Sequence, residues 1–207
     1  VAGPVLDGKV KFTNLPWELD SELIESELGI PVSFINDLEA TAYGLAALKE
    51  NELVTLYEGD NEAIGNMAII APGTGLGEAG MYFDGASYHP FATEGGHCDF
   101  ATRSEEDIEV YRFLHLQHDH VSWERVLSGA GILTLFQFLV EVKGMIPQSW
   151  VTEKMKDMDP PAVISQAALE NKCSVCYYTM QLFKKYLAYE SAQLVLKTKA
   201  TGGLIIA

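Results

Sequence analysis

A continuous apolar run followed by closely spaced glycines constrains the fold of this chain more than any other feature. The run covers residues 67–71 and is followed by Pro72-Gly73-Thr74-Gly75-Leu76-Gly77. An uninterrupted apolar stretch of this length is typical of a buried strand. A second stretch with strand character, residues 79–83, then leads into an Asp84-Gly85 turn. The sequence therefore predicts a buried strand, a glycine-rich loop and a further strand in immediate succession.

The glycine-rich loop has two interpretations. Glycines at positions 73, 75 and 77 let the backbone bend tightly and present several N–H groups to one oxyanion, and Thr74 adds a hydroxyl donor. Such an arrangement suits a phosphate group. The same glycines also suit a plain hairpin, because their spacing matches neither the Walker A motif nor the dinucleotide-binding fingerprint. The local pattern leaves both interpretations open.

An Asn-Asp pair stands where a second apolar stretch turns helical. Residues 31–35 are rich in β-branched and aromatic side chains and predict a strand, whereas the residues after Asp37 repeat at helical spacing. Asp37 can therefore cap the helix, since aspartate accepts hydrogen bonds from the free amides of a first helical turn. A base is the other interpretation, because ligands bind at the carboxyl ends of strands in α/β sheets.

Two further stretches combine acids with glycines. Glu94-Gly95-Gly96-His97 places a carboxylate and an imidazole on one tight turn, where both can reach a polyhydroxylated ligand. A solvated surface turn is the alternative. Further on, a short helical piece containing Glu124 ends at residues 128–131, and an amphipathic helix is expected to restart at Ile132. Glu124 by itself would be interpreted as a solvated helix residue.

Composition narrows the class of partner. The chain has 207 residues, 48% hydrophobic and 21% charged, with a formal net charge of −15. That charge argues against binding to nucleic acid or to an anionic membrane, since both depend on concentrated Lys and Arg. No apolar run reaches the length of a membrane span, and nothing near Val1 resembles a signal peptide. Three cysteines are too few and too odd in number for a disulfide framework, which favours a reducing, cytoplasmic location.

Several segments predict structure alone. Residues 9–12 alternate as a half-buried strand, and Asp20 or Ser21 can cap a helix that ends before Gly29. The polar residues 49–66 predict a surface loop or a domain junction. Residues 104–107 have the form of a capping box, which makes their acids structural. The helical period of residues 175–196 predicts a long core helix.

Two groups of possible metal ligands are interpreted as structural. His115, His118 and His120 lie close together, but no thiolate or carboxylate cluster with ligand spacing accompanies them, so exposed histidines near a helix end are expected. Cys173 and Cys176 have the spacing of a redox or zinc-knuckle pair. No second pair completes a site, so half-buried thiols in a helix are expected.

The two ends of the sequence predict a piece of a longer protein. The chain starts with Val-Ala-Gly-Pro rather than methionine, and it stops within residues 202–207, whose pattern indicates the middle of a buried strand.

Taken in order, these motifs resemble the bacterial-type glucokinases over nearly the whole chain. They are the Thr13-Asn14 loop, Phe-Ile-Asn-Asp-Leu-Glu-Ala, Gly-Thr-Gly-Leu-Gly, Glu-Gly-Gly-His-Cys-Asp-Phe-Ala, Glu-Arg-Val-Leu-Ser-Gly-Ala-Gly-Ile and the final Ala-Thr-Gly-Gly-Leu-Ile-Ile-Ala. The resemblance implies the two-domain α/β fold of actin-like ATPases, which is ribonuclease H-like, in incomplete form. Residues 1–46 would be the C-terminal part of the smaller N-terminal domain. Residues 47–207 would be the larger domain, truncated at its C-terminus.

The same resemblance assigns roles. Asp37 would be the general base that takes the proton of the 6-hydroxyl of glucose as that hydroxyl attacks the γ-phosphoryl group of ATP. The other sugar-binding residues would be Asn36, Glu94, His97 and Glu124. Gly73, Thr74, Gly75 and Gly77 would meet the ATP phosphates. Related enzymes are often dimers, so a homodimer is one expected state, with neither nucleic acid nor membrane as a partner.

The departures from the family pattern matter as well. The family's N-terminal Asp-x-Gly-Gly-Thr hairpin, whose aspartate helps to hold Mg²⁺, would precede Val1, so no metal ligand is assigned in this chain. Gly202 and Gly203 lie near the adenosine motif, whose second glycine pair would follow Ala207. The zinc-binding cysteine motif of the related repressor and sugar-kinase family is also missing, which favours the plain glucokinase branch.

Two other functions stay open beside the kinase. A sugar-responsive regulatory protein on the same fold would keep the sugar-binding residues without transferring phosphate, although the intact base and glycine loop favour the enzyme. Alternatively, this stretch of chain is inert by itself, since it lacks the phosphate hairpin.

Overall fold

The N-terminal part of the chain forms a small antiparallel sheet with one helix. The computed structural model describes residues 1, 5–12, 15–45, 48–60 and 62–207, so the Thr13-Asn14 loop and the expected domain boundary after residue 46 lie outside the described residues. Strands β1 (Val5–Leu6), β2 (Lys9–Lys11) and β3 (Glu18–Asp20) pair in that order. The predicted strand after Gly8 is confirmed, whereas β3, which the sequence analysis did not anticipate, pairs with it across the intervening loop.

Helix α1 (Ser21–Leu28) has the ends that its sequence predicts. Asp20 is its N-cap and accepts a hydrogen bond from the Glu22 amide at 3.0 Å. Gly29 closes it in the left-handed conformation, at φ 68°, where a residue without Cβ avoids strain.

The prediction of a strand at residues 31–35 is wrong. These residues have no regular secondary structure and lead directly into helix α2 (Asp37–Leu45). Val1 bonds to this segment, with its terminal nitrogen donating to Ile35 O and its carbonyl accepting from Asp37 N, each at 3.0 Å. A strand needs a ladder of partners, and among the described residues this segment finds one paired residue rather than a neighbouring strand. Composition alone was therefore not sufficient for these residues to form a strand.

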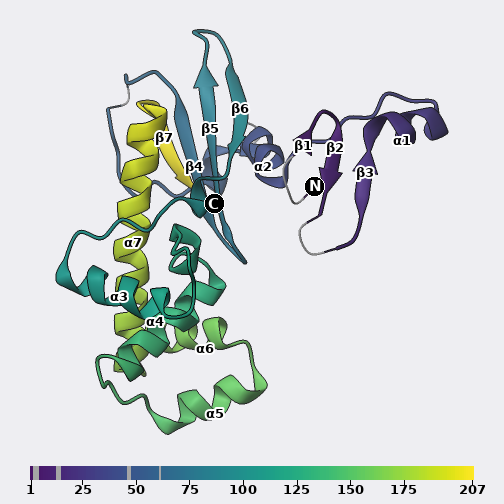
Figure 1. The fold of residues 1–207 in the computed structure, drawn as a ribbon. Coiled ribbons are helices and arrows are strands. Elements are labelled where there is room, and N and C mark those ends of the chain that lie inside the picture. The colour runs from purple at the N-terminus through teal and green to yellow at the C-terminus, as the bar shows by residue number, and fades with distance from the viewer. Residues whose placement is uncertain (2–4, 13–14, 46–47, 61) are drawn as a thin grey trace.

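A larger mixed sheet forms the centre of the molecule (Figure 1). Its strand order is β6-β5-β4-β7, and the four strands are β4 (Met67–Pro72), β5 (Leu76–Phe83), β6 (Tyr88–Thr93) and β7 (Gly203–Ile206). β4 and β7 are parallel, and the other pairs are antiparallel. The predicted strands on either side of the glycine loop are confirmed. The predicted strand at the end of the chain is also present, although its residues are only partly buried.

Helices cover both faces of this sheet. Alternate residues of β4 face opposite ways, so Ala68 and Ile70 pack into the main core, whereas Ile69 packs beneath Ala42 of α2. The main core also contains most of the remaining helices. These are α3 (Glu105–His115), α4 (Gly129–Glu141), α5 (Ser149–Asp157), α6 (Pro160–Leu169) and α7 (Ser174–Thr198). The chain also forms the short 3₁₀ turns η1 (Glu50–Glu52), η2 (Gly95–His97) and η3 (Trp123–Arg125).

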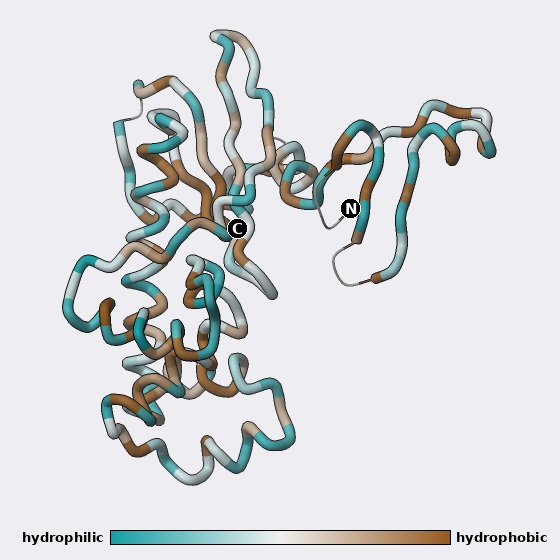
Figure 2. The backbone as a smooth tube through the Cα atoms, in the orientation of Figure 1, coloured by the Kyte–Doolittle hydropathy of each residue, from teal (hydrophilic) through white to brown (hydrophobic). Residues whose placement is uncertain are grey.

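The predicted long core helix is confirmed as α7, which has 25 residues. Figure 2 shows hydrophobic segments concentrated where the sheet lies against α7 and among the helices below it. Tyr178 and Leu196 follow the apolar period of residues 175–196 but are 53% and 79% exposed, so part of the apolar surface of this helix is uncovered. Among the described residues, no helix is both long and apolar enough to cross a membrane.

The cysteine pair differs from its prediction. Cys173 and Cys176 are 2% and 0% exposed, so they are fully rather than half buried. Cys173 is the N-cap of α7, and its Sγ accepts from the Cys176 amide at 3.3 Å. Burial raises the pKa of the Cys176 thiol, which keeps it in the unreactive protonated form.

Capping explains the starts of two other helices. Ser104 caps α3 as predicted, and the buried carboxylate of Asp107 accepts from the Arg103 amide at 2.9 Å and pairs with Lys185 at 2.6 Å. Helix α4 begins at Gly129 rather than at Ile132, because Ser128 caps it through the Gly131 amide at 3.1 Å. Gly129 and Gly131, which the sequence analysis placed between two helices, therefore belong to the first turn of α4.

Candidate functional site

The predicted site residues surround one open groove of about 420 Å³. Its walls come from the start of α2, the β4–β5 loop, η2 and η3. The residues that line it are Asp37, Leu38, Thr41, Ala71, Gly73, Thr74, Gly75, Leu76, Gly77, Glu94, His97 and Glu124. Every residue to which the family resemblance assigns a role in binding sugar or phosphate is among them except Asn36. Asn36 lines an adjoining hollow of about 260 Å³, which shares Glu94 with the groove.

Asp37 is the first residue of α2, and its side chain is exposed. The capping role belongs mainly to its neighbour, since Asn36 Oδ1 accepts from the Leu38 amide at 2.8 Å. Asp37 Oδ1 accepts from the same amide at 2.9 Å. The helix start thus fixes the orientation of the Asp37 side chain at the groove.

The glycine loop is both a hairpin and an anion-binding candidate. Pro72 and Leu76 are paired across it, and Gly73 N donates to Gly75 O at 2.8 Å. The Gly129 amide donates to Gly73 O at 2.9 Å and holds the loop against the start of α4. The N–H groups of Thr74 and Gly75 donate to no acceptor within the described part of the chain. Two adjacent free amides at a loop tip suit an oxyanion, so the two interpretations of the loop are compatible.

Glu124 links the glycine loop to η3. Its Oε2 accepts a hydrogen bond from the Leu76 amide at 3.0 Å, so it is not the freely solvated side chain that its position alone would indicate. The Gly75 backbone lies against the same oxygen, since a Cβ at residue 75 would come within 2.5 Å of Glu124 Oε2. A larger residue at this position would therefore push the Glu124 carboxylate aside.

Glu94 and His97 project from the predicted tight turn, which is the 3₁₀ turn η2. Glu94 Oε2 and His97 Nε2 are 3.8 Å apart, and the two side chains are 64% and 61% exposed. Gly96 makes the turn possible, because a Cβ there would lie 2.2 Å from the Leu76 carbonyl oxygen. Both polar groups are thus held at the groove while staying open to a ligand.

Sequence reasoning missed some of the lining. Thr41 lies one turn after Asp37 on α2, and its hydroxyl donates to Asp37 O at 3.0 Å. The i,i+4 spacing along the predicted helix was the signal that could have found it. Ala71 and Leu76 flank the loop and offer mainly backbone and apolar contacts.

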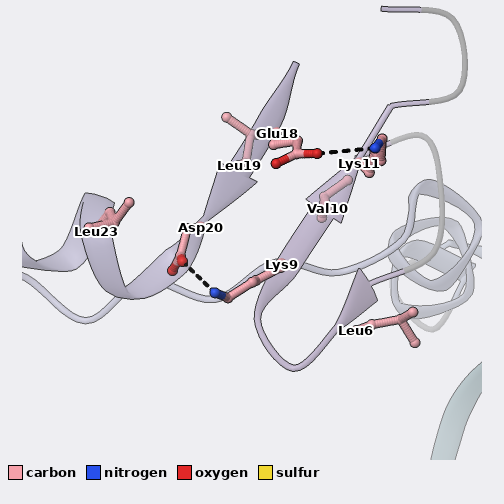
Figure 3. A pocket seen from close by; sticks show the side chains of 8 residues that line it. All are labelled: Leu6, Lys9, Val10, Lys11, Glu18, Leu19, Asp20 and Leu23. Atoms are coloured by element: carbon pink, nitrogen blue, oxygen red, sulfur yellow. Dashed lines mark ion pairs between the residues drawn. The ribbon is translucent and has the colours of Figure 1, made fainter. Parts of the chain in front are cut away.

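A larger hollow of about 570 Å³ lies away from the groove, on the small N-terminal sheet. Figure 3 shows two ion pairs in this hollow, Lys9–Asp20 at 3.0 Å and Lys11–Glu18 at 3.2 Å, with Val10 between them. None of the residues expected to contact sugar or phosphate lines it. The chemistry predicted from the sequence therefore belongs to the smaller groove.

A comparison of this sequence with models of protein families identifies the family to which the chain belongs. The model described as glucokinase matches residues 1–207. This chain belongs to the glucokinase family. A curated glucokinase from Nostoc punctiforme is 38% identical over 221 aligned residues, which cover 100% of this chain and 65% of that protein. The chain thus spans a little less than two thirds of that relative.

Solved glucokinases share the fold. A glucokinase from an Antarctic psychrotroph is 32% identical, with a TM-score of 0.79 over 100% of this chain and 62% of the other. A glucokinase from Balamuthia mandrillaris, solved in complex with glucose, is 21% identical, with a TM-score of 0.77 over 100% and 61% of the two chains, and it bears on the fold alone. The predicted α/β fold of actin-like sugar kinases, in incomplete form, is confirmed.

Proposed function

We propose that this chain is part of an ATP-dependent glucokinase, which transfers the γ-phosphoryl group of ATP to the 6-hydroxyl of glucose and yields glucose 6-phosphate and ADP. One observation carries the proposal beyond family membership. The groove places the exposed carboxylate of Asp37 across from a loop whose tip has two free amides. Phosphoryl transfer needs a group that orients the attacking hydroxyl and donors that hold the phosphates, and the groove offers both.

Asp37 is assigned as the general base. It stands at the start of α2 and lines the groove, so it can accept the proton of a bound hydroxyl as that hydroxyl attacks phosphorus. The remaining hydroxyls of glucose are assigned to Asn36, Glu94, His97 and Glu124. These side chains combine acceptors and donors, which suits a polyol. Glu124 is of particular interest, because its hydrogen bond to the Leu76 amide connects the sugar residues to the glycine loop.

The phosphates of ATP are assigned to Gly73, Thr74, Gly75 and Gly77. The free Thr74 and Gly75 amides and the exposed Thr74 hydroxyl are donors that can receive phosphate oxygens. Mg²⁺ would neutralise charge on the transferring phosphate. We assign it no ligand here, because no described carboxylate beside the loop lacks a sugar-binding assignment.

The remaining assignments concern the whole protein. We assign residues 1–46 to a smaller domain and residues 47–207 to a larger one, with closure of the two bringing ATP to the sugar. A cytoplasmic enzyme fits its substrates, ATP and glucose, and a homodimer is proposed by analogy with related enzymes. Neither nucleic acid nor membrane is proposed as a partner, since the chain has a formal net charge of −15.

The test is Asp37→Ala in the complete enzyme. We expect turnover to fall by about three orders of magnitude or more, because the attacking hydroxyl loses its proton acceptor. Glucose affinity should weaken much less, since other side chains hold the sugar. Steady-state kinetics and calorimetric titration with glucose measure the two effects separately.

The matched control is Glu22→Ala, which removes an acid from the first turn of α1, away from the groove. It should leave both quantities unchanged. An Asp37→Ala enzyme that keeps most of its turnover would sink the assignment of the base. Glucose binding with no phosphoryl transfer in the unmodified protein would point instead to a sugar-responsive regulator.

A further inference from the structure

Two buried carboxyl groups face each other beneath the sheet. Glu78 of β5 is 1% exposed and Glu190 of α7 is 0% exposed. Glu78 is in register with Ile70 of β4, whose side chain faces the α7 side of the sheet. Glu190 is well supplied with donors, since it accepts from Lys197 Nζ at 2.9 Å and from Gln193 Nε2 at 2.8 Å. Glu78 Oε1 is buried and has no hydrogen-bond partner among the described residues.

The turn that presents Glu94 and His97 rests directly on Glu78. A Cβ at Gly95 would lie 1.9 Å from Glu78 Oε2 and 2.8 Å from its Cδ, so the backbone of η2 packs against the carboxyl group. The Thr93 hydroxyl completes the contact. It donates to the Glu78 carbonyl at 2.9 Å and accepts from the Gly95 amide at 3.2 Å. Glu78 therefore supports the turn through both its side chain and its main chain.

The charges around Glu78 do not balance when both carboxyl groups are ionised. Burial and the neighbouring Glu190 raise the pKa of Glu78 to about 7, and burial raises the pKa of Glu190 despite its bond to Lys197. Lys197 is the cation that faces the pair from α7. Arg103, before α3, lowers the pKa of Glu190 to a smaller extent than Lys197 does, and Cys98, which follows η2, acts on Lys197. Full ionisation thus places two buried negative charges against one ammonium group.

We propose that Glu78 is a positioning residue for glucose: in its protonated form it supports the η2 turn and holds Glu94 and His97 at the groove. Loss of the proton puts two carboxylates side by side beneath Gly95 and loosens the turn. Sugar affinity then falls as the pH rises through neutrality. The inference rests on the proposed function, since it takes Glu94 and His97 as sugar ligands.

The experiment measures the glucose dissociation constant of the complete protein by calorimetry between about pH 6 and about pH 8.5. We expect the constant of the unmodified protein to rise about threefold or more over this range, as the supporting proton is lost. Glu78→Gln keeps the shape of a protonated carboxyl group and cannot ionise, so its profile should be flat. Glu153→Gln, at an exposed glutamate of α5 paired with Lys156, should follow the unmodified protein.

The outcomes separate the two proposals. A Glu78→Gln profile parallel to that of the unmodified protein overturns the positioning role while leaving the sugar site in place. Absence of glucose binding at every pH overturns the proposed function and this inference with it.

A second measurement needs no variant. Hydrogen exchange of the His97 and Cys98 amides, which donate to Glu94 O and Gly95 O, reports on the turn itself. Their protection factors should fall above about pH 7, whereas those in the Asp84–Ser87 turn stay constant. Constant protection at His97 and Cys98 would overturn the proposal even if Glu78→Gln failed to fold.

Discussion

Replacing the buried Glu78 by glutamine is expected to make the chain more stable at alkaline pH. Burial and the facing Glu190 raise the pKa of Glu78 from 4.5 to about 7. The folded chain therefore holds a proton between these values that the unfolded chain has lost. The contribution of Glu78 to the free energy of unfolding is therefore largest below about pH 4.5, falls as the pH rises, and levels off above about pH 7.

The size of the effect follows from the width of that window. At about 1.4 kcal/mol per pH unit, the loss for Glu78 amounts to about 3 kcal/mol between pH 4.5 and pH 7. Glutamine stays neutral throughout, and its side chain has nearly the shape of a protonated carboxyl group. Glu78→Gln should therefore match the parent within about 1 kcal/mol near pH 5, and exceed it by up to about 3 kcal/mol near pH 8.

Urea unfolding followed by tryptophan fluorescence provides the assay, because Trp123 is buried in the main core beside Phe100. The free energy of unfolding is compared at several pH values, with equal urea dependence required of both proteins. The exposed Glu153→Gln serves again as the control and should stay within a few tenths of a kcal/mol of the parent. Parent and Glu78→Gln curves that run parallel from pH 5 to pH 8 would refute the reasoning, since Glu78 would then not hold the proton.

Two further predictions concern the groove. Glu124→Ala should lower glucose affinity by about 30-fold, the equivalent of about 2 kcal/mol for hydrogen bonds to a charged group. Glu124→Gln should retain part of that affinity, because an amide oxygen can still accept from Leu76 N. Calorimetry with glucose measures both variants, and equal losses would count against this role. Gly75→Ala should weaken glucose binding by about tenfold, because the added Cβ would displace the Glu124 carboxylate. In the control Gly73→Ala the added Cβ has no atom within 4 Å, so this protein should bind glucose normally. An unaffected Gly75→Ala protein would show that the carboxylate can move without loss of affinity.

Local patterns predicted well those features that local physics decides. The caps of α1 and α3, the strands beside the glycine loop and the long helix α7 each follow from a few neighbouring residues, whose hydrogen bonds close within one turn or one strand. The groove was predictable for a different reason. Its residues stand in several short motifs whose order matches a family, and that order carries spatial information that no single motif contains.

The failures share a dependence on distant partners. Residues 31–35 have the composition of a strand, but the described part of the chain offers them no neighbouring strand to pair with. The burial of Cys173 and Cys176 depends on how α7 packs, not on their own spacing. The role of Glu78, an acid in a mainly apolar strand, was not predicted, because it depends on packing against Glu190, more than half the chain away in sequence.

The packing of α2 on the sheet also sets a spacing within the groove. A Cβ at Gly77 would lie 3.1 Å from Leu38 Cδ1, so the glycine strand and the helix that begins at Asp37 meet at van der Waals contact. Two apolar surfaces in contact act as a rigid spacer, whose length changes little with salt or proton concentration. Hydrogen bonds and ion pairs elsewhere in the groove respond to both. The separation between Asp37 and the β4–β5 loop is therefore the dimension of this groove that the solvent controls least.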